Sequence, residues 1–244
     1  MKIFLAGTFG EEKNIETIKR SKYVLESFYY VKPWQLEIIK SSEAFMLDSG
    51  AFTFMQGKNK RIDWDDYIEK YSQFINDHHI ELFFELDIDS VVGHERVIQL
   101  RKKLERMTNR QPIPVWHSNR GADEFIKSCE EYPYVALGGI VGQEWKPSHE
   151  KYMTWFIKQA HKRGSKIHGL GYTKVGNLPK YHFDSVDSTR WNCARFGRIE
   201  YFDGKTIRPI DKRRQGKRVA TKSDANMFTF QEWVKFQQWA ENNL

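Results

Sequence analysis

Short apolar segments alternate with amphipathic helical segments along most of this chain, at a spacing of roughly 25 to 40 residues. Several of the apolar segments are hydrophobic nearly throughout, which is typical of parallel strands covered by helices. The predicted strands span 2–7, 43–48, 81–88, 113–118, 134–140, 166–172 and 181–186, with 198–204 as a candidate eighth. Seven or eight such repeats favour a single-domain α/β fold, a (β/α)8 TIM barrel, over an open doubly wound sheet.

The chain contains no Gly/Ser-rich or Pro-rich linker, so the sequence predicts no separate second domain. Residues 1–204 are predicted to form the barrel. Residues 205–244 are predicted to form a basic loop and a C-terminal helix that completes it. Asp63 is placed to cap a helix, and Thr229 with Glu232 resembles a capping box ahead of the last helix.

Composition narrows the class of protein. The 244 residues are 40% hydrophobic and 15% aromatic, which allows a large buried core and argues against global disorder. No apolar run approaches the roughly 18 residues that a membrane span needs, and the N-terminal apolar stretch is too short for a secretory signal. The two cysteines, Cys129 and Cys193, are too few for a thiolate-rich zinc site. We therefore expect a cytoplasmic protein without a zinc subdomain and without any metal.

The formal net charge is +7, and the excess is concentrated in DKRRQGKR, residues 211–218. Such a run predicts a polyanionic partner, although a solvated basic loop is the alternative interpretation. The predicted nucleic-acid contacts in this run are Lys212, Arg213, Arg214, Lys217 and Arg218.

Acids and glycines recur at the predicted carboxyl ends of the strands, where a TIM barrel carries its active site. A single aspartate there is more often a helix cap, but three acids with two glycine clusters favour an active site. Glycine pairs also let a flat ligand approach the backbone closely. The residues at these ends are Asp48-Ser49-Gly50, Asp87 and Asp89, His117, Gly138-Gly139, Gly169-Leu170-Gly171 and Asp184.

Four segments resemble, in order, motifs of the queuine and archaeosine tRNA-guanine transglycosylases. LDSGAF (47–52) is similar to their D-S-G-G-F segment, and ALGGIVG (136–142) to their glycine pair. HGLGY (168–172) resembles their glycine-x-glycine strand end, and FDSVDSTRWNCARFGRI (183–199) their F-D-x-V-x-P-T-R pattern. The resemblance implies a TIM barrel that exchanges a guanine in a polynucleotide for a 7-deazaguanine by double displacement.

The resemblance also implies roles for three acids. Asp184 is similar to the nucleophile that attacks C1′, and Asp48 to the general acid/base beside it. Asp87 resembles the acid that reads the guanine-type edge of the base. Asp187 is a second candidate nucleophile, but it falls on a usually apolar family position, so Asp184 is preferred.

Other residues are predicted to hold the base or the polynucleotide. The backbone at Gly139 and Ile140 would hold the carbonyl of the base, and Arg190 would support the site or a phosphate, with Arg195 close by. The remaining predicted base contacts are Ser49, His117, Gly138, Gly169 and Gly171.

The residue types fit this chemistry. One carboxylate can trap an oxocarbenium-like centre as a covalent glycosyl-enzyme, while a second carries a proton between leaving and incoming base. No cofactor is expected, since the 7-deazaguanine base is the co-substrate.

The chain lacks the cysteine-rich zinc site that follows the barrel motif in the tRNA enzymes, and it is basic. These departures favour the related phage and bacterial enzymes that insert 7-deazaguanines into DNA. Three alternatives stay open: the same exchange on tRNA, a nucleoside or glycoside hydrolase, and a non-catalytic nucleic-acid-binding barrel. The sequence leaves open which base is inserted, the target context and strandedness, and the oligomeric state.

Overall fold

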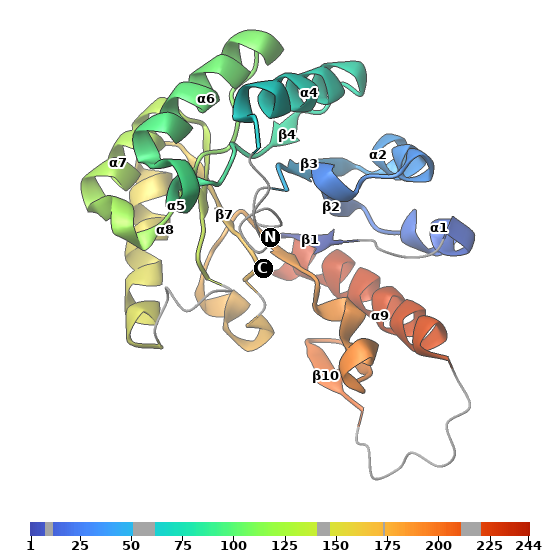
Figure 1. Ribbon diagram of the computed structural model, residues 1–244. Coiled ribbons are helices and arrows are strands. Elements are labelled where there is room, and N and C mark those ends of the chain that lie inside the picture. The colour runs from blue at the N-terminus through green and yellow to red at the C-terminus, as the bar shows by residue number, and fades with distance from the viewer. Residues whose placement is uncertain (8–11, 51–61, 141–146, 173, 211–220) are drawn as a thin grey trace.

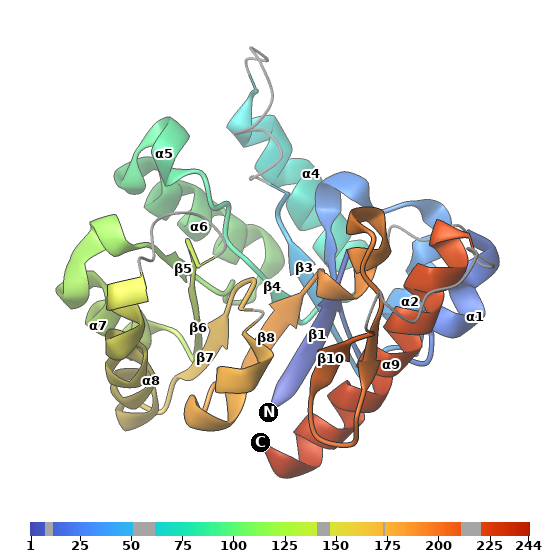
Figure 2. The ribbon, with the colours of Figure 1, turned by 90° about the horizontal axis from the view of Figure 1, so that it is seen from below.

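The computed structural model of this chain describes residues 1–7, 12–50, 62–140, 147–172, 174–210 and 221–244. Its eight parallel strands form a barrel, and the curled sheet can be followed in Figures 1 and 2. The strand order is β4-β3-β2-β1-β8-β7-β6-β5, and a parallel bridge between Phe84 and Ile113 joins β4 to β5. Each strand therefore lies beside its neighbours in sequence, and β8 lies beside β1. The strands are β1 Lys2–Ala6, β2 Tyr23–Ser27, β3 Ala44–Asp48, β4 Leu82–Phe83, β5 Val115–Trp116, β6 Tyr134–Leu137, β7 Lys166–Gly169 and β8 Ser185–Ser188. The predicted TIM-barrel fold is confirmed.

Helices surround the strands and cover the outer face of the sheet (Figure 1). The α-helices are α1 Ile15–Ile18, α2 Leu36–Ser41, α4 Trp64–Asp77, α5 Asp89–Val92, α6 His94–Thr108, α7 Gly121–Glu131, α8 Met153–Lys162 and α9 Lys222–Asn243. Short 3₁₀ turns include η2 Phe28–Tyr30, η4 Ser118–Arg120, η6 Val175–Lys180 and η7 Arg190–Phe196. Asp63 caps α4 as predicted, since its side chain accepts the backbone N–H groups of Asp65 and Asp66.

Side chains alternate between the barrel interior and the helix-covered face, as the period of two along a strand requires. On β1, Phe4 and Ala6 belong to the interior cluster, while Ile3 and Leu5 pack in the outer core against the helices. The interior cluster is Phe4, Ala6, Tyr23, Leu25, Met46, Phe84, Ile113, Val115 and Ala136. This alternation decides which acids face the barrel mouth.

The strand prediction needs two corrections. The second barrel strand is β2, Tyr23–Ser27, which was not predicted. The described helical segments between β1 and β2 are only the 3₁₀ turn Glu12–Asn14 and the four-residue helix α1, so no full helical repeat marks the strand. The segment 198–204 is no barrel strand: β9, Glu200–Phe202, pairs antiparallel with β10, Ile207–Pro209. In this hairpin Glu200 is buried and Tyr201 exposed, an alternation that suits an antiparallel pair better than a covered parallel strand.

The C-terminal helix α9 packs along β1, η7 and β9. It begins at Lys222 with a capping box of Thr221 and Asp224, well before the predicted one, so Thr229 and Glu232 lie buried inside the helix. The side chain of Gln237 is fully buried and donates to the carbonyls of Ile3 and Tyr23 at 2.7 and 2.9 Å. Both chain ends therefore meet at the amino end of the barrel (Figure 2).

Across the described part of the chain, no helix has the length and apolar character required to span a membrane.

Candidate active site

Asp48 is the last residue of β3 and lies at the carboxyl end of the barrel. The backbone N–H of Gly50 donates to its Oδ2 atom at 3.1 Å, so the chain turns sharply back toward the carboxylate. Gly50 has φ +77°, and a Cβ atom there would lie 2.7 Å from the Cβ of Tyr29. Only glycine fits at position 50. The turn that it forms fixes the orientation of the Asp48 side chain.

Burial raises the pKa of Asp48 to about 6, and the neighbouring carboxylates of Asp87 and Asp187 add to the effect. Tyr67 lies beside it and donates to the backbone carbonyl of Ser49 at 2.5 Å. Burial and the Asp48 charge both raise the pKa of Tyr67, which keeps that hydroxyl a donor. A carboxyl that exchanges a proton near neutral pH is suited to general acid/base catalysis.

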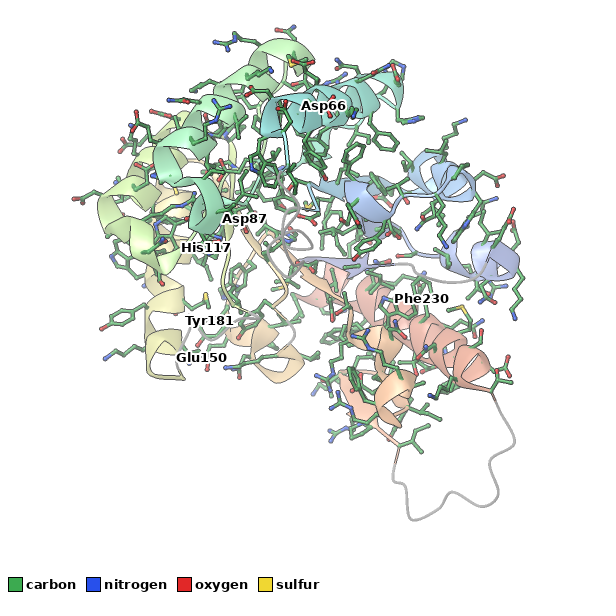
Figure 3. All side chains as sticks on the ribbon, viewed as in Figure 1. Asp66, Asp87, His117, Glu150, Tyr181 and Phe230 are labelled. Carbon is green, nitrogen blue, oxygen red and sulfur yellow. The ribbon has the colours of Figure 1, made fainter. Side chains whose placement is uncertain are left out.

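Asp87 and His117 form a close pair beside Asp48. His117 Nε2 lies 2.7 Å from Asp87 Oδ1, and Figure 3 shows the two side chains near one another at the barrel mouth. Their side chains are 12% and 18% exposed, in the order His117 and Asp87, which leaves room for contact with a ligand. A Cβ atom on Gly138 would lie 2.7 Å from His117 Nε2, so this glycine makes space for the imidazole.

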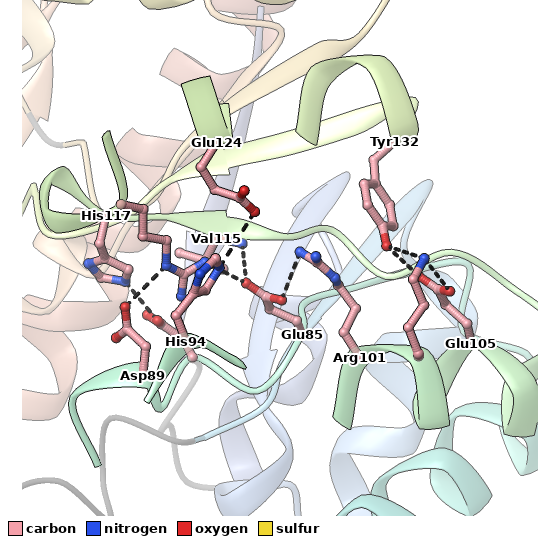
Figure 4. A network of polar contacts seen from close by, with 12 residues as sticks. Glu85, Asp89, His94, Arg101, Glu105, Val115, His117, Glu124 and Tyr132 are labelled. Carbon is pink, nitrogen blue, oxygen red and sulfur yellow. Dashed lines mark hydrogen bonds and ion pairs between the residues drawn. The ribbon is translucent and has the colours of Figure 1, made fainter. Parts of the chain in front are cut away.

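A buried ionic network, which the sequence analysis did not predict, supports this side of the mouth (Figure 4). Glu85 is fully buried and accepts from Arg101 and Arg120, both at 3.2 Å, and from the backbone of Val115 at 2.8 Å. Arg120 also donates to Asp89 at 3.1 Å. The signal for this network is a glutamate inside the apolar run ELFFELDI, because a buried charge there requires a cationic partner.

Asp87, Asp89 and His117 are also the one group of described residues that could hold a metal ion, since their ligand atoms lie within 4.8 Å of one another. All three groups are already engaged, because Asp87 and His117 contact each other and Asp89 contacts the Arg120 guanidinium. A fixed positive charge at Asp89 disfavours a second cation there.

Asp187 is the third residue of β8, and alternation along the strand turns its side chain into the barrel. Its Oδ1 atom accepts the backbone N–H of Gly171 at 2.5 Å and lies 3.1 Å from His168 Nε2. Both contacts reach Oδ1, and no described residue forms a hydrogen bond with Oδ2. Asp187 therefore lies on the same mouth as Asp48, with one oxygen anchored and one left for a ligand.

The predicted placement of Asp184 is wrong. Asp184 directly precedes β8, so it lies at the amino end of the barrel, opposite Asp48. Its side chain turns outward, where Oδ2 lies 2.9 Å from His161 Nε2 of α8 and accepts the backbone N–H of Ile167 at 2.8 Å. The predicted strand 181–186 ends two residues before β8 does. Because of this error, Asp184 was expected near the carboxyl end of the strand, where Asp187 lies instead.

The predicted base contacts divide into two groups. Gly139 (φ +71°), Ile140 and Gly171 (φ +68°) follow the carboxyl ends of β6 and β7, as the prediction required. Ser49 is instead fully buried, and at Gly169 a Cβ atom would meet Tyr172 and Phe183 on the helix side. The structure therefore gives Ser49 and Gly169 packing positions, away from the barrel mouth.

The structure describes two of the predicted polynucleotide contacts, Arg190 and Arg195. Arg190 is held in an ion pair with buried Glu200 at 2.8 Å. Arg195 is exposed and stacks on the Phe196 ring, 4.6 Å from its centroid. The basic residues Lys212, Arg213, Arg214, Lys217 and Arg218 lie outside the described residues.

No protein-family model and no curated protein matches the sequence. Among solved structures, a putative fructose-1,6-bisphosphate aldolase from Coccidioides immitis is 10% identical with a TM-score of 0.54, covering 99% of this chain and 89% of its own. The carboxyl transferase domain of Rhizobium etli pyruvate carboxylase is 13% identical with a TM-score of 0.49; the match covers 98% of this chain but only 48% of that longer one. A variant of the citrate synthase SbnG is 11% identical with a TM-score of 0.47, covering 80% of this chain and 89% of its own. At these identities the likeness to the aldolase shows the fold alone, an α/β barrel of the TIM type.

Proposed function

We propose that this chain is an enzyme that exchanges a guanine base in DNA for a 7-deazaguanine, with Asp187 as the nucleophile and Asp48 as the general acid/base. One observation carries the proposal: Asp48 at the end of β3 and the inward-facing Asp187 of β8 share the barrel mouth. The motif resemblance to the guanine transglycosylases supplies the reaction class, and the correction from Asp184 to Asp187 supplies the missing partner at the mouth.

In the first step, Asp187 Oδ2 attacks C1′ of the target nucleoside as the C1′–N9 bond breaks, giving a glycosyl ester and a departing guanine. The departing base carries the electron pair of the broken bond and takes a proton from Asp48. In the second step, the incoming 7-deazaguanine gives its N9 proton to Asp48 and attacks C1′, which frees Asp187. Two inversions retain the configuration at C1′.

The Asp87–His117 pair is suited to reading the base. A carboxylate accepts N–H protons from the amine edge of a guanine, and the backbone N–H groups near Gly139 and Ile140 can meet its carbonyl. His117, fixed at 2.7 Å from Asp87, would hold that carboxylate in place and present its ring at the edge of the pocket.

A basic chain with a net charge of +7 suits a polyanionic substrate, and phosphate neutralisation would contribute most of the affinity. The zinc subdomain expected of the tRNA enzymes has no counterpart in the cysteine content of this sequence. These two features favour DNA over tRNA.

The test is incorporation of labelled guanine and 7-deazaguanines into duplex DNA, single-stranded DNA and tRNA. Asp187→Asn should abolish incorporation, and Asp48→Asn should lower its rate by about 10²–10⁴-fold, the usual contribution of a proton-transfer group. Asp184→Asn is the matched control, because Asp184 directly precedes the same strand at the opposite end of the barrel, and it should retain activity. Incorporation that survives Asp187→Asn but not Asp184→Asn would overturn the assignment, and release of free base without incorporation would indicate a hydrolase.

A further inference from the structure

A chain of hydrogen bonds runs through the barrel interior from the amino ends of the strands to Asp187. The Tyr134 hydroxyl lies 2.5 Å from Ser185 Oγ, and Ser185 Oγ lies 2.5 Å from His168 Nδ1. His168 Nε2 then lies 3.1 Å from Asp187 Oδ1. Tyr134 comes from β6, His168 from β7, and Ser185 and Asp187 from β8. Of these four residues, the proposed function uses only Asp187.

The surroundings of His168 limit the hydrogen bonds that its ring can form. The ring is fully buried, with the aromatic rings of Phe84 and Phe4 at centroid distances of 5.4 and 6.1 Å. Its two nitrogens therefore meet polar partners only at Ser185 and Asp187 among the described residues. A buried imidazole with two partners is held in one ring orientation.

With a neutral His168 imidazole, one assignment of protons satisfies every member of the hydrogen-bond chain. Tyr134 donates to Ser185, Ser185 donates to His168 Nδ1, and His168 donates from Nε2 to Asp187. Burial raises the pKa of Tyr134, so its hydroxyl keeps its proton and anchors the direction of the chain. The reverse direction would leave Asp187, an acceptor when ionised, facing a nitrogen without a proton.

We infer that His168 is a positioning residue that, with Ser185 and Tyr134 behind it, fixes the Oδ1 atom of Asp187 so that Oδ2 points into the mouth. The inference rests on the proposed function for its catalytic meaning. The groups that face Asp187 are His168 from β7, the Gly171 N–H after β7, and the charge of Asp48 from β3. The His168 and Gly171 contacts both reach Oδ1, so this oxygen is the one held in place.

The first arm of the test requires no activity. Long-range ¹H–¹⁵N spectra of the imidazole groups should show His168 with its proton on Nε2, the signal being assigned by its loss in His168→Phe. At one fixed pH, the ¹³C signal of the Asp187 carboxyl should shift in His168→Phe relative to the wild type, because Oδ1 loses its imidazole partner. A proton on Nδ1, or an unchanged Asp187 carboxyl signal, would overturn the inference.

The second arm uses base exchange. His168→Phe should lower kcat by about 10- to 100-fold with little change in KM, the usual effect of removing a residue that orients a reacting group. His168→Gln should recover part of kcat, because its amide can still donate to Asp187.

His161→Gln is the matched control, because His161 makes a similar contact with Asp184 at 2.9 Å on the outside of the barrel. It should leave both arms unchanged, and an equal loss of kcat in His161→Gln would contradict a specific role for His168. A wild type without exchange that still shows the Nε2 proton and the Asp187 shift would refute the proposed function and leave the hydrogen-bond chain in place.

Discussion

At the scale of single residues, Asp48 combines two properties that sequence inspection cannot separate. It stabilises a local turn by accepting the Gly50 N–H, and it carries a carboxyl whose pKa burial raises to about 6. A cap alone would have its pKa lowered by the N–H donor, so the raised value distinguishes Asp48 from an ordinary turn aspartate.

The raised pKa of Asp48 has a consequence for stability. The folded state holds this proton more tightly than the unfolded chain, so the contribution of Asp48 to the free energy of unfolding falls as pH rises from about 4 through about 6. Asp48→Asn should therefore raise the free energy of unfolding by about 1–3 kcal/mol at pH 7.5 and by much less at pH 4. Urea unfolding at the two pH values measures this difference, and an equal effect at both would contradict the assigned shift.

At the scale of elements, the carboxyl ends of β4 and β5 depend on a buried charge network. Glu85 meets Arg101 from α6 and Arg120 from η4, and all three are nearly inaccessible to water. Through Asp89, the same network reaches the start of α5, close to the Asp87–His117 pair. The network therefore ties the Asp87–His117 side of the mouth to the helices outside the barrel.

Glu85→Gln should lower the free energy of unfolding by about 3 kcal/mol or more, because it leaves Arg101 buried without its carboxylate. Lys70→Met provides the comparison, since it removes an exposed ion pair with Asp66 on α4 and should change stability within experimental error. Denaturant unfolding of both variants tests this. Equal effects would show that the buried network does not support the fold.

The sequence predicts elements better than their exact ends. Hydrophobic runs located seven of the eight barrel strands, because burial on both faces leaves a signal in the amino-acid pattern. The ends of each strand are set by its pairing with neighbouring strands, and the hydrophobic pattern carries no information about this pairing. In β8 the pairing runs from Ser185 against Lys2 to Ser188 against Leu5, and this register selects Asp187 over Asp184 for the interior. Asp48, Asp87 and His117 were found because each directly follows a clear apolar run, whereas His168 and Arg120 act through partners that only the fold brings near.

At the scale of the whole molecule, α9 closes the barrel by linking the two ends of the chain. Gln237 lies at the centre of this contact, where it donates to the carbonyls of Ile3 and Tyr23 and accepts the backbone N–H of Lys22. Gln237→Ala should lower the free energy of unfolding by about 2–4 kcal/mol, since it leaves these buried backbone groups without partners. The exposed neighbour Gln238→Ala should have little effect in the same unfolding experiment, and similar losses in both would contradict a specific role for Gln237.

The central claim is that Asp187, and not Asp184, forms a bond to the sugar during base exchange. Acid quenching of the enzyme during turnover with a guanine-containing DNA oligonucleotide, followed by nuclease and trypsin digestion, tests it directly. Both acids fall in the tryptic peptide YHFDSVDSTR, residues 181–190, so fragmentation mass spectrometry can locate a deoxyribose adduct within one peptide. The account predicts the added mass on Asp187 and its absence in Asp187→Asn; an adduct on Asp184, or one that persists in Asp187→Asn, would contradict it.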